Sequence, residues 1–384
     1  CREHGLLSRF QAYGNPTLIG MAEGYMIPDI PEGNNVIFSY QHGPHHTDHF
    51  TWKHGTGDMI WNKYAAAGGH LRGKPIISCE ANTNVLGVFQ ATLATVKQSD
   101  DMNFITGINH SVLHGFNYVP PDVPFPGFVR FGTYFSEHNT WWPHFRRWTD
   151  YNARLSHVFQ ATEPVAEVAL LGPAPDVWSD HELAKVPFHL TPWYFHRLWE
   201  PIAQTGATCD YLHGNVIDNA QTDSGKLAYG PMRYDVLIVS DMATMRPETA
   251  QTIQRLAEAG GKVLFVGTLP HRSPELTSAS ARDQRVQEAI EAALLAGAKQ
   301  IAAPEVEADL RPWLEQALRL VDFKPPMSVR QPSDALFSVR QQLAGDDILF
   351  FTNTHRHQSA RTVVDLKLGD RGLCSDFSFD IGVF

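Results

Sequence analysis

Short apolar runs alternate with segments of helical periodicity along residues 1–322, and this alternation constrains the fold more than any other feature of the sequence. Neighbouring parallel strands cannot be joined by a tight turn, and the connection between them is usually a helix. Repeated strand–helix units therefore predict an α/β protein built on parallel sheets. The chain has 384 residues, which is enough for about two or three domains.

The first predicted domain, residues 1–160, contains four strand–helix units. Gly73 and Gly107 are suited to end two of its helices as C-caps. Because a complete (β/α)8 barrel takes about 250 residues, these units predict the C-terminal half of such a barrel, and we interpret the chain as a fragment that lacks the first part. We expect strands near 6–12, 36–40, 75–79 and 108–116, and helices near 58–69, 85–102 and 141–161.

Two further domains are predicted after the half-barrel. Residues 161–322 have the pattern of a flavodoxin-like, doubly wound α/β domain, and residues 323–384 have short alternating runs that predict the start of a β-sandwich. Neither a G-x-G-x-x-G motif nor a P-loop is present, so the sequence gives no support for nucleotide binding. In the second domain we expect strands near 165–171, 234–240 and 262–266, and helices near 192–205, 247–259, 282–296 and 306–321.

Composition narrows the class of partner. The net charge of -10 and the lack of a Lys/Arg cluster argue against nucleic acid. No run of 18 apolar residues occurs, so we predict no membrane partner, and no signal peptide is visible. Residues 1–160 hold 12 of the 19 His and five of the nine Trp. Such side chains suit a carbohydrate partner, because aromatic rings stack on sugars and imidazoles bond hydroxyls; ordinary core aromatics are the alternative.

Glu80 is the strongest candidate for a catalytic residue. The apolar run Pro-Ile-Ile-Ser-Cys at 75–79 ends at Glu80, and polar residues follow. The carboxyl ends of the strands of an α/β barrel meet at the active site, and cleavage of a glycosidic bond needs a pair of carboxylates. The alternative is a carboxylate that stabilises the N-terminus of a helix.

The next predicted strand supplies candidate substrate-binding residues. Side-chain alternation places His110 and His114 on one face and Asn109 on the other, while Asn117 and Tyr118 begin the following loop. Imidazoles can bond sugar hydroxyls or influence the charge of a neighbour. The alternative is that the histidines are buried and fully hydrogen-bonded within the fold.

The loop at residues 131–142 is rich in aromatic side chains and leads into a helix. Glu137 is the second candidate catalytic carboxylate. Asn139, Trp141 and Trp142 are candidate substrate-binding residues, and we expect one Trp to pack in the core and the other to line the site. Glu32, which lies in an earlier loop, is a further candidate for a catalytic carboxylate and for substrate binding.

Residues 42–49 contain five side chains of metal-binding type. Their spacing matches no zinc signature, and His-rich loops are often only polar. We therefore predict no metal ligands in this segment.

Taken in order, these motifs resemble those of glycoside hydrolase family 106. They are G-K-P-x-x-S-x-E-A-x-T from Gly73, Lys97 with Asp101, G-I-N-H-x-V-x-H from Gly107, Pro126-Gly127, and N-T-W-W from Asn139. The resemblance covers about residues 1–175. It departs from the family pattern in residues 29–35 and at Glu137.

The resemblance implies an α-L-rhamnosidase with an α/β barrel and appended domains. It also implies inversion of configuration with Glu80 as the base, calcium dependence in some members, and a secreted or periplasmic location. We expect the substrates to be plant or microbial polysaccharides or glycosides. The partner acid is expected on an earlier strand outside this chain, in which case the fragment alone would be inactive. Two alternatives stay open: another barrel glycosidase resembling the β-galactosidases, and a carbohydrate-binding remnant without catalysis.

Overall fold

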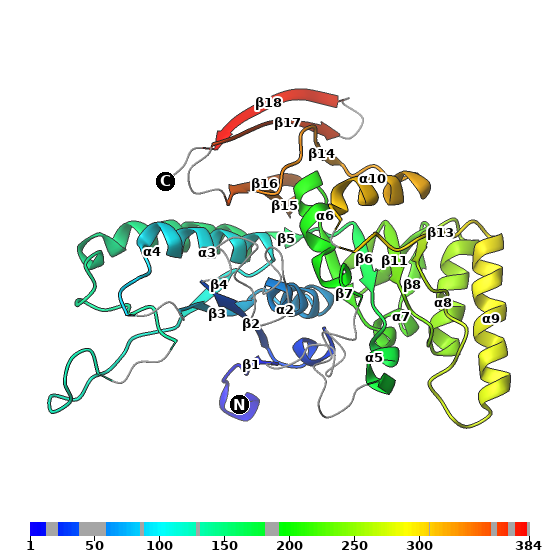
Figure 1. Ribbon diagram of the computed structural model, residues 1–384, viewed down its shortest axis with the longest axis horizontal. Coiled ribbons are helices and arrows are strands. Elements are labelled where there is room, and N and C mark those ends of the chain that lie inside the picture. The colour runs from blue at the N-terminus through cyan, green and yellow to red at the C-terminus, as the bar shows by residue number, and fades with distance from the viewer. Residues whose placement is uncertain are drawn as a thin grey trace.

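The chain folds into two parallel sheets that lie side by side, with a β-rich part packed against helices on one side of both (Figure 1). The predicted α/β fold is confirmed. No helix in the part that is described is both long and apolar enough to cross a membrane. The computed structural model describes residues 1–12, 22–37, 59–84, 88–127, 131–180, 192–306, 308–354, 359–367 and 373–381.

The first sheet has four strands in the order β1-β2-β3-β4, and each neighbouring pair is parallel. The helices between its strands end where the sequence predicts, because Gly73 (φ 59°) and Gly107 (φ 98°) take the left-handed conformation that a C-cap requires. The elements of this part are η1 (Arg2–His4), β1 (Arg9–Gln11), η3 (Glu23–Met26), β2 (Ile30–Val36), α2 (Ile60–Leu71), β3 (Ser78–Thr83), α3 (Leu93–Ile105), β4 (His110–Leu113), η6 (Trp142–His144) and α4 (Phe145–Ala161).

Helix α2 lies between the two parallel sheets, and all twelve of its residues are buried. A helix enclosed on every side is apolar or small over most of its circumference, which explains the run of alanines and glycines. A Cβ atom on Gly68 would lie 2.6 Å from the Cβ of Tyr25. At the end of α2, the Nδ1 atom of His70 lies 2.9 Å from Asp210 of the second sheet, and both side chains are buried.

The second sheet has five parallel strands in the order β13-β12-β11-β6-β7. If the five strands are numbered in chain order and read from β7 to β13, the order is 2-1-3-4-5, which is the order of flavodoxin-like sheets. One face packs against α6 and α10, and the other against α7, α8 and α9. The elements are β6 (Val168–Leu171), α5 (Ala174–Asp180), η8 (Phe195–Arg197), α6 (Trp199–Thr205), β7 (Cys209–Leu212), α7 (Gly214–Asp218), β11 (Val236–Ser240), α8 (Pro247–Glu258), β12 (Lys262–Val266), α9 (Ala279–Leu295), β13 (Lys299–Ile301) and α10 (Leu310–Leu320).

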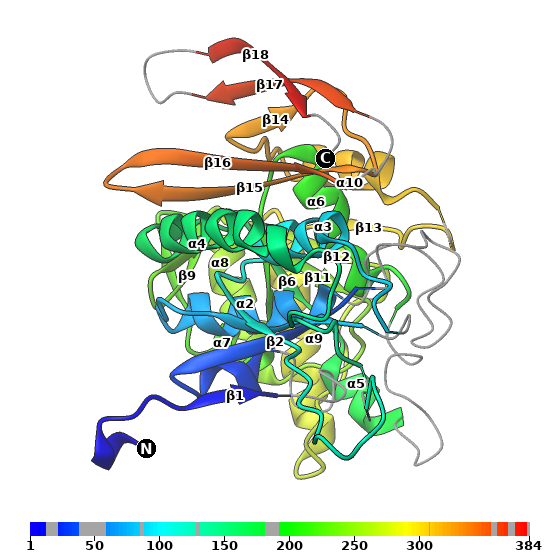
Figure 2. The ribbon, with the colours of Figure 1, turned by 90° about the vertical axis from the view of Figure 1, so that its left-hand side faces the viewer.

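Three small antiparallel sheets complete the described structure. Sheet β10-β9-β8 lies within the second part, whereas sheets β16-β15-β5 and β14-β17-β18 form the β-rich part. Helices α3 and α4 lie between the first sheet and the β15–β16 hairpin (Figure 2). The strands are β5 (Glu163–Pro164), β8 (Gln221–Asp223), β9 (Lys226–Tyr229), β10 (Met232–Tyr234), β14 (Met327–Val329), β15 (Leu336–Leu343), β16 (Asp346–Asn353), β17 (Ala360–Lys367) and β18 (Leu373–Ile381).

Strand β2 corrects the prediction of a strand at 36–40. It runs from residue 30 to 36, and residues 38–40 lie outside the described part. The segment Ile-Pro-Glu-Gly-Asn-Asn-Val shows no apolar alternation, because Glu32 and Asn34 carry polar groups on one face. The other face lies so close to α2 that a Cβ on Gly33 would be 2.2 Å from Oδ1 of Asn62. A glycine is therefore required where β-propensity would predict a branched side chain.

Strand β7 was not predicted, although all four of its residues are buried. Asp210 interrupts its apolar run in the sequence. In the structure, the Asp210 carboxylate accepts hydrogen bonds from Tyr234 Oη at 3.0 Å and from His70 Nδ1 at 2.9 Å. These partners come from a distant strand and from α2, so only the tertiary structure explains a buried carboxylate in this edge strand.

Candidate active site

The candidate site lies on one face of the first sheet, where strand pairing places polar side chains in two rows. Alternate residues of a strand share a face, so the register alone decides which side chains meet. The rows are Gln11–Glu32–Ser78–His110 and Asn34–Glu80–Val112.

Glu80 on β3 is held through a single carboxylate oxygen. Its Oε1 atom accepts hydrogen bonds from Thr83 Oγ1 at 2.9 Å and from Asn34 Nδ2 at 3.3 Å, and His114 Nδ1 lies 3.3 Å away. In the part of the chain that is described, no group bonds to Oε2, and 35% of the side chain is exposed. Donors that converge on one oxygen favour the charged carboxylate, and the other oxygen is left to meet a ligand or water.

Thr83 links Glu80 to His114. Its hydroxyl has a single proton, which it donates to Glu80, so it accepts the hydrogen bond from His114 Nδ1 at 2.9 Å. This arrangement requires the His114 tautomer with a proton on Nδ1. The imidazole therefore supports the Glu80 carboxylate through the threonine.

A β-bulge, which no sequence pattern indicates, brings Thr83 to this face. The register with β2 shifts so that Asn34 pairs with Glu80 but Val36 pairs with Thr83. Asn82 takes a left-handed backbone conformation, with φ 65°, which asparagine tolerates better than most residues. Simple alternation would place Thr83 on the opposite face from Glu80, and the extra residue reverses that.

Glu32 lies beside Glu80 but is buried and already paired. Its Oε2 atom accepts a hydrogen bond from Ser78 Oγ at 2.8 Å and lies 3.2 Å from Arg9 Nε. His110 is next in the same row and is exposed. Desolvation against the sheet and the charge of Arg9 lower the pKa of His110, while Glu32 works in the opposite direction.

Comparison with known proteins identifies the family. The sequence profile of the alpha-L-rhamnosidases of glycoside hydrolase family 106 matches residues 49–369, which is most of the chain. The chain belongs to glycoside hydrolase family 106. Its fold and site can therefore be interpreted as those of part of a family 106 member.

Solved structures agree with this assignment at the level of the fold. A rhamnosidase from Novosphingobium sp. PP1Y superposes with a TM-score of 0.66 at 21% identity, over 90% of this chain and 31% of that one. A catalytic mutant of the GH42 beta-galactosidase from G. stearothermophilus superposes with a TM-score of 0.59 at 12% identity, over 94% of this chain and 59% of that one.

A curated relative from Formosa agariphila bears the name "Putative beta-glucuronidase". It is 28% identical over 229 residues, which cover 59% of this chain and 18% of the relative. The family 106 chain thus spans less than a third of the length of the relative and of the Novosphingobium rhamnosidase.

The opposite face of the first sheet holds a buried carboxylate that sequence reasoning did not single out. Asp100 on α3 is fully buried and accepts hydrogen bonds from Ser111 Oγ at 3.0 Å, Asn103 Nδ2 at 2.9 Å and Asn152 Nδ2 at 2.9 Å. Burial raises the pKa of Asp100 to about 7, and the charge of Asp101 raises it further. The three hydrogen bonds act in the opposite direction and lower this pKa. Asp100 ties α3 and α4 to β4, the strand that leads to His114.

Two residues named for substrate binding have structural roles instead. Asn109 is buried at the start of β4, where it accepts from the backbone N–H of Ile77 at 2.9 Å and donates to the carbonyl of Pro75 at 3.0 Å. Asn139 is also buried and donates to the carbonyl of Tyr134 at 3.2 Å. Both amides therefore bond to nearby backbone.

The two tryptophans differ in their surroundings. Trp141 packs against Phe135 and donates from Nε1 to the carbonyl of Ala91 at 2.8 Å, whereas Trp142 is 36% exposed and stacks on Phe145. Trp142 is the tryptophan of this pair that a ligand could reach.

The remaining candidates lie on the loops beyond β4. Glu137 is exposed over 67% of its side chain, and its recorded ion-pair neighbour among the described residues is His138 at 4.0 Å. Tyr118 is 73% exposed. Asn117 lies against Gly132, and its buried Oδ1 atom has no partner among the described residues. The structure shows no contact between these described side chains and Glu80.

The His-rich segment at 42–49 lies outside the described residues. Among those that are described, no group of three His, Cys, Asp or Glu side chains gathers as a metal site requires. The calcium implied by the resemblance therefore has no such set of ligands among the described residues.

Proposed function

We propose that this chain forms part of the catalytic unit of an inverting α-L-rhamnosidase, with Glu80 as the general base. The observation that supports this most directly is the asymmetry of the Glu80 carboxylate, in which donors hold Oε1 while no described group bonds to Oε2. A base held through one oxygen can take a proton from water with the other. Glu80 lies within β3, three residues before the carboxyl end of the strand, and the chemistry of a barrel lies at the carboxyl ends of its strands.

The first sheet suits the C-terminal half of a (β/α)8 barrel, because its four parallel strands pair in chain order with helices between them. The flavodoxin-like part would be non-catalytic, and residues 323–384 would begin a β-sandwich. An inverting pair of carboxyl groups is separated by about 6.5–9.5 Å. We place the acid on a strand that completes the barrel, with Glu137 as the alternative within this chain.

The substrate would be a plant or microbial polysaccharide or glycoside, and the enzyme would then act in the periplasm or outside the cell. His110 and Trp142 are our main candidates for contacts to the sugar, since both are exposed. Asn117 and Tyr118 would contribute from the loop beyond β4. Glu32 would act indirectly, because its carboxylate is already paired with Ser78 and Arg9.

The test is the Glu80→Gln variant of the full-length protein with 4-nitrophenyl α-L-rhamnopyranoside. Loss of a general base lowers the rate about 10²- to 10⁴-fold, so kcat should fall by that factor while the circular dichroism spectrum is unchanged. Glu258→Gln on the exposed face of α8 is the matched control and should keep full activity. Proton NMR of the first-formed sugar should show the inverted anomer.

Four results would contradict the proposal. Near-normal activity of Glu80→Gln would remove Glu80 from the mechanism, and a retained anomer would remove inversion. Activity only on 4-nitrophenyl β-D-galactoside or β-D-glucuronide would assign a different glycosidase. Binding of rhamnosides without hydrolysis by the full-length protein would favour a carbohydrate-binding remnant.

A further inference from the structure

A pocket lies at the carboxyl edge of the flavodoxin-like sheet, and none of the residues around Glu80 lines it. Its volume is about 700 Å³, which is within the range of small-molecule sites. Gly172 follows β6, His213 follows β7 and Met242 follows β11, so the pocket opens where the chain order reverses across the sheet. In open α/β sheets this switch point is where ligands bind.

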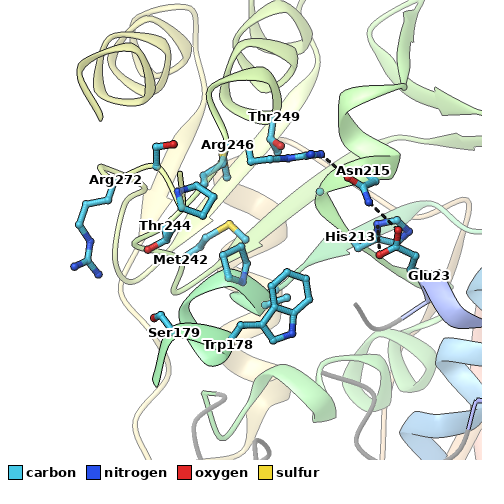
Figure 3. A pocket seen from close by; sticks show the side chains of 17 residues that line it. Glu23, Trp178, Ser179, His213, Asn215, Met242, Thr244, Arg246, Thr249 and Arg272 are labelled. Atoms are coloured by element: carbon cyan, nitrogen blue, oxygen red, sulfur yellow. Dashed lines mark hydrogen bonds and ion pairs between the residues drawn. The ribbon is translucent and has the colours of Figure 1, made fainter. Parts of the chain in front are cut away.

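The pocket has an apolar side and a polar side (Figure 3). Trp178 on α5 is 47% exposed and lies near Met242. On the other side, Arg246 donates to Asn215 Oδ1, and Asn215 Nδ2 donates to Glu23 Oε1 at 2.8 Å. Glu23 comes from η3, so the wall of the pocket joins the first part of the chain to the second.

The geometry disfavours a phosphate or another anion. The loop after β6 contains Pro173 and Pro175, which have no N–H to donate, and the N–H of Ala174 is bonded to the carbonyl of Gly172. The Asp176 carboxylate takes the N–H groups of residues 243 and 244 at 2.9 and 3.1 Å. The donors that cradle a phosphate in other sheets of this type are therefore missing or already used.

The cations around the pocket are also engaged. Arg246 forms an ion pair with Asp218, and the Arg272 guanidinium points away from the other labelled side chains, 3.9 Å from Asp176. Burial lowers the pKa of His213, Glu23 opposes this change and Arg246 adds to it, so the imidazole brings no positive charge at neutral pH. Glu23, with 43% of its side chain exposed, offers acceptor oxygens.

An exposed aromatic face opposite a carboxylate and an amide is the pairing that suits a sugar, whose C–H face is apolar and whose rim carries hydroxyls. We propose that this pocket binds a neutral pyranose unit, stacked on Trp178 and hydrogen-bonded by Glu23, as a non-catalytic saccharide site. The site is independent of the chemistry proposed for Glu80. A sugar bound here would contact both the first and the second part of the chain.

The experiment uses the full chain labelled with 5-fluorotryptophan, and fluorine NMR during titration with L-rhamnose, D-galactose or inorganic phosphate. The Trp178→Phe variant identifies the resonance of Trp178, and Trp142→Phe identifies that of Trp142 as a probe of the other site. We expect the Trp178 resonance to shift saturably with at least one of the two sugars and to be unchanged by phosphate. The same shift should occur in Glu80→Gln, which separates this site from catalysis.

Glu23→Gln should raise the Kd obtained from the sugar titration about tenfold. The reason is that a hydrogen bond from a sugar hydroxyl to a charged group is replaced by one to a neutral group. Glu258→Gln is the control and should leave the titration unchanged. A Trp178 resonance that neither sugar moves would overturn the proposal, as would a shift produced by phosphate. An unchanged Kd for the sugar in Glu23→Gln would also overturn it, since Glu23 would then not contact the ligand.

Discussion

Replacing Asp100 by asparagine should remove a large part of the pH dependence of stability. Asp100 is fully buried, and its pKa in the folded protein is raised from 3.8 to about 7. Below about pH 4 the carboxyl is protonated in both states, so it makes no difference to stability. Between about pH 4 and about pH 7 the unfolded chain loses this proton while the folded chain keeps it, so stability falls as the pH rises.

The size of the effect follows from the interval between the two pKa values. Each pH unit in that interval changes the free energy of unfolding by about 1.4 kcal/mol, and the whole interval gives a loss of about 4 kcal/mol, to order of magnitude. Above about pH 7 the contribution is constant, because the carboxyl is then ionised in both states. Asparagine does not titrate, and its side-chain oxygen can still accept the hydrogen bonds of Ser111 and Asn103.

The assay is urea unfolding followed by tryptophan fluorescence, at a series of pH values from about 4 to about 8. The quantity of interest is the difference in unfolding free energy between wild type and Asp100→Asn, which cancels the other titrating groups. This difference should move in favour of the variant as the pH rises. Asp150→Asn, at a side chain that is 55% exposed, is the control and should run parallel to wild type. Parallel curves for Asp100→Asn as well would refute the reasoning.

Two further changes test the site and the fold. Thr83→Val should lower kcat about 10- to 100-fold with little change in KM or folding, because it removes a hydrogen bond to the charged Glu80; unchanged kinetics would show that the link is not used. Gly230→Ala should destabilise the protein by about 2 kcal/mol or more, measured by urea unfolding, because φ is 53° and the new Cβ would lie 2.4 Å from the carbonyl oxygen of Leu71. Gly260 also has a positive φ, of 80°, but a Cβ added there would have no neighbour within 4 Å, so Gly260→Ala is the control. An equal loss of stability in both variants would show that the clash with Leu71 is not the cause.

Helices and strands that are set by neighbouring residues in the chain were predictable from the sequence. Strand β12 at 262–266 lies where its apolar run predicts, and Gly73 and Gly107 end their helices as C-caps. Helix α3 begins later than expected, at Leu93, because Thr92 caps it with a hydrogen bond from the N–H of Thr95. That signal is also local, and a capping rule would have found it.

Within the candidate site, the sequence by itself determined that Glu80 follows an apolar run and that His110 and His114 share a face, because strand alternation has a fixed period of two residues. The strand predicted at 75–79 lies instead at Ser78–Thr83, so Glu80 is within it and not at its end. Only the tertiary structure decided what surrounds Glu80. Asn34 lies in a segment without apolar alternation, and Thr83 reaches the site through a bulge. Pairing between strands that are distant in the chain sets the register, and register cannot be read from either strand alone. For the same reason, Asn109 and Asn139 looked like ligand-binding amides in the sequence, and the structure shows that they bond to nearby backbone.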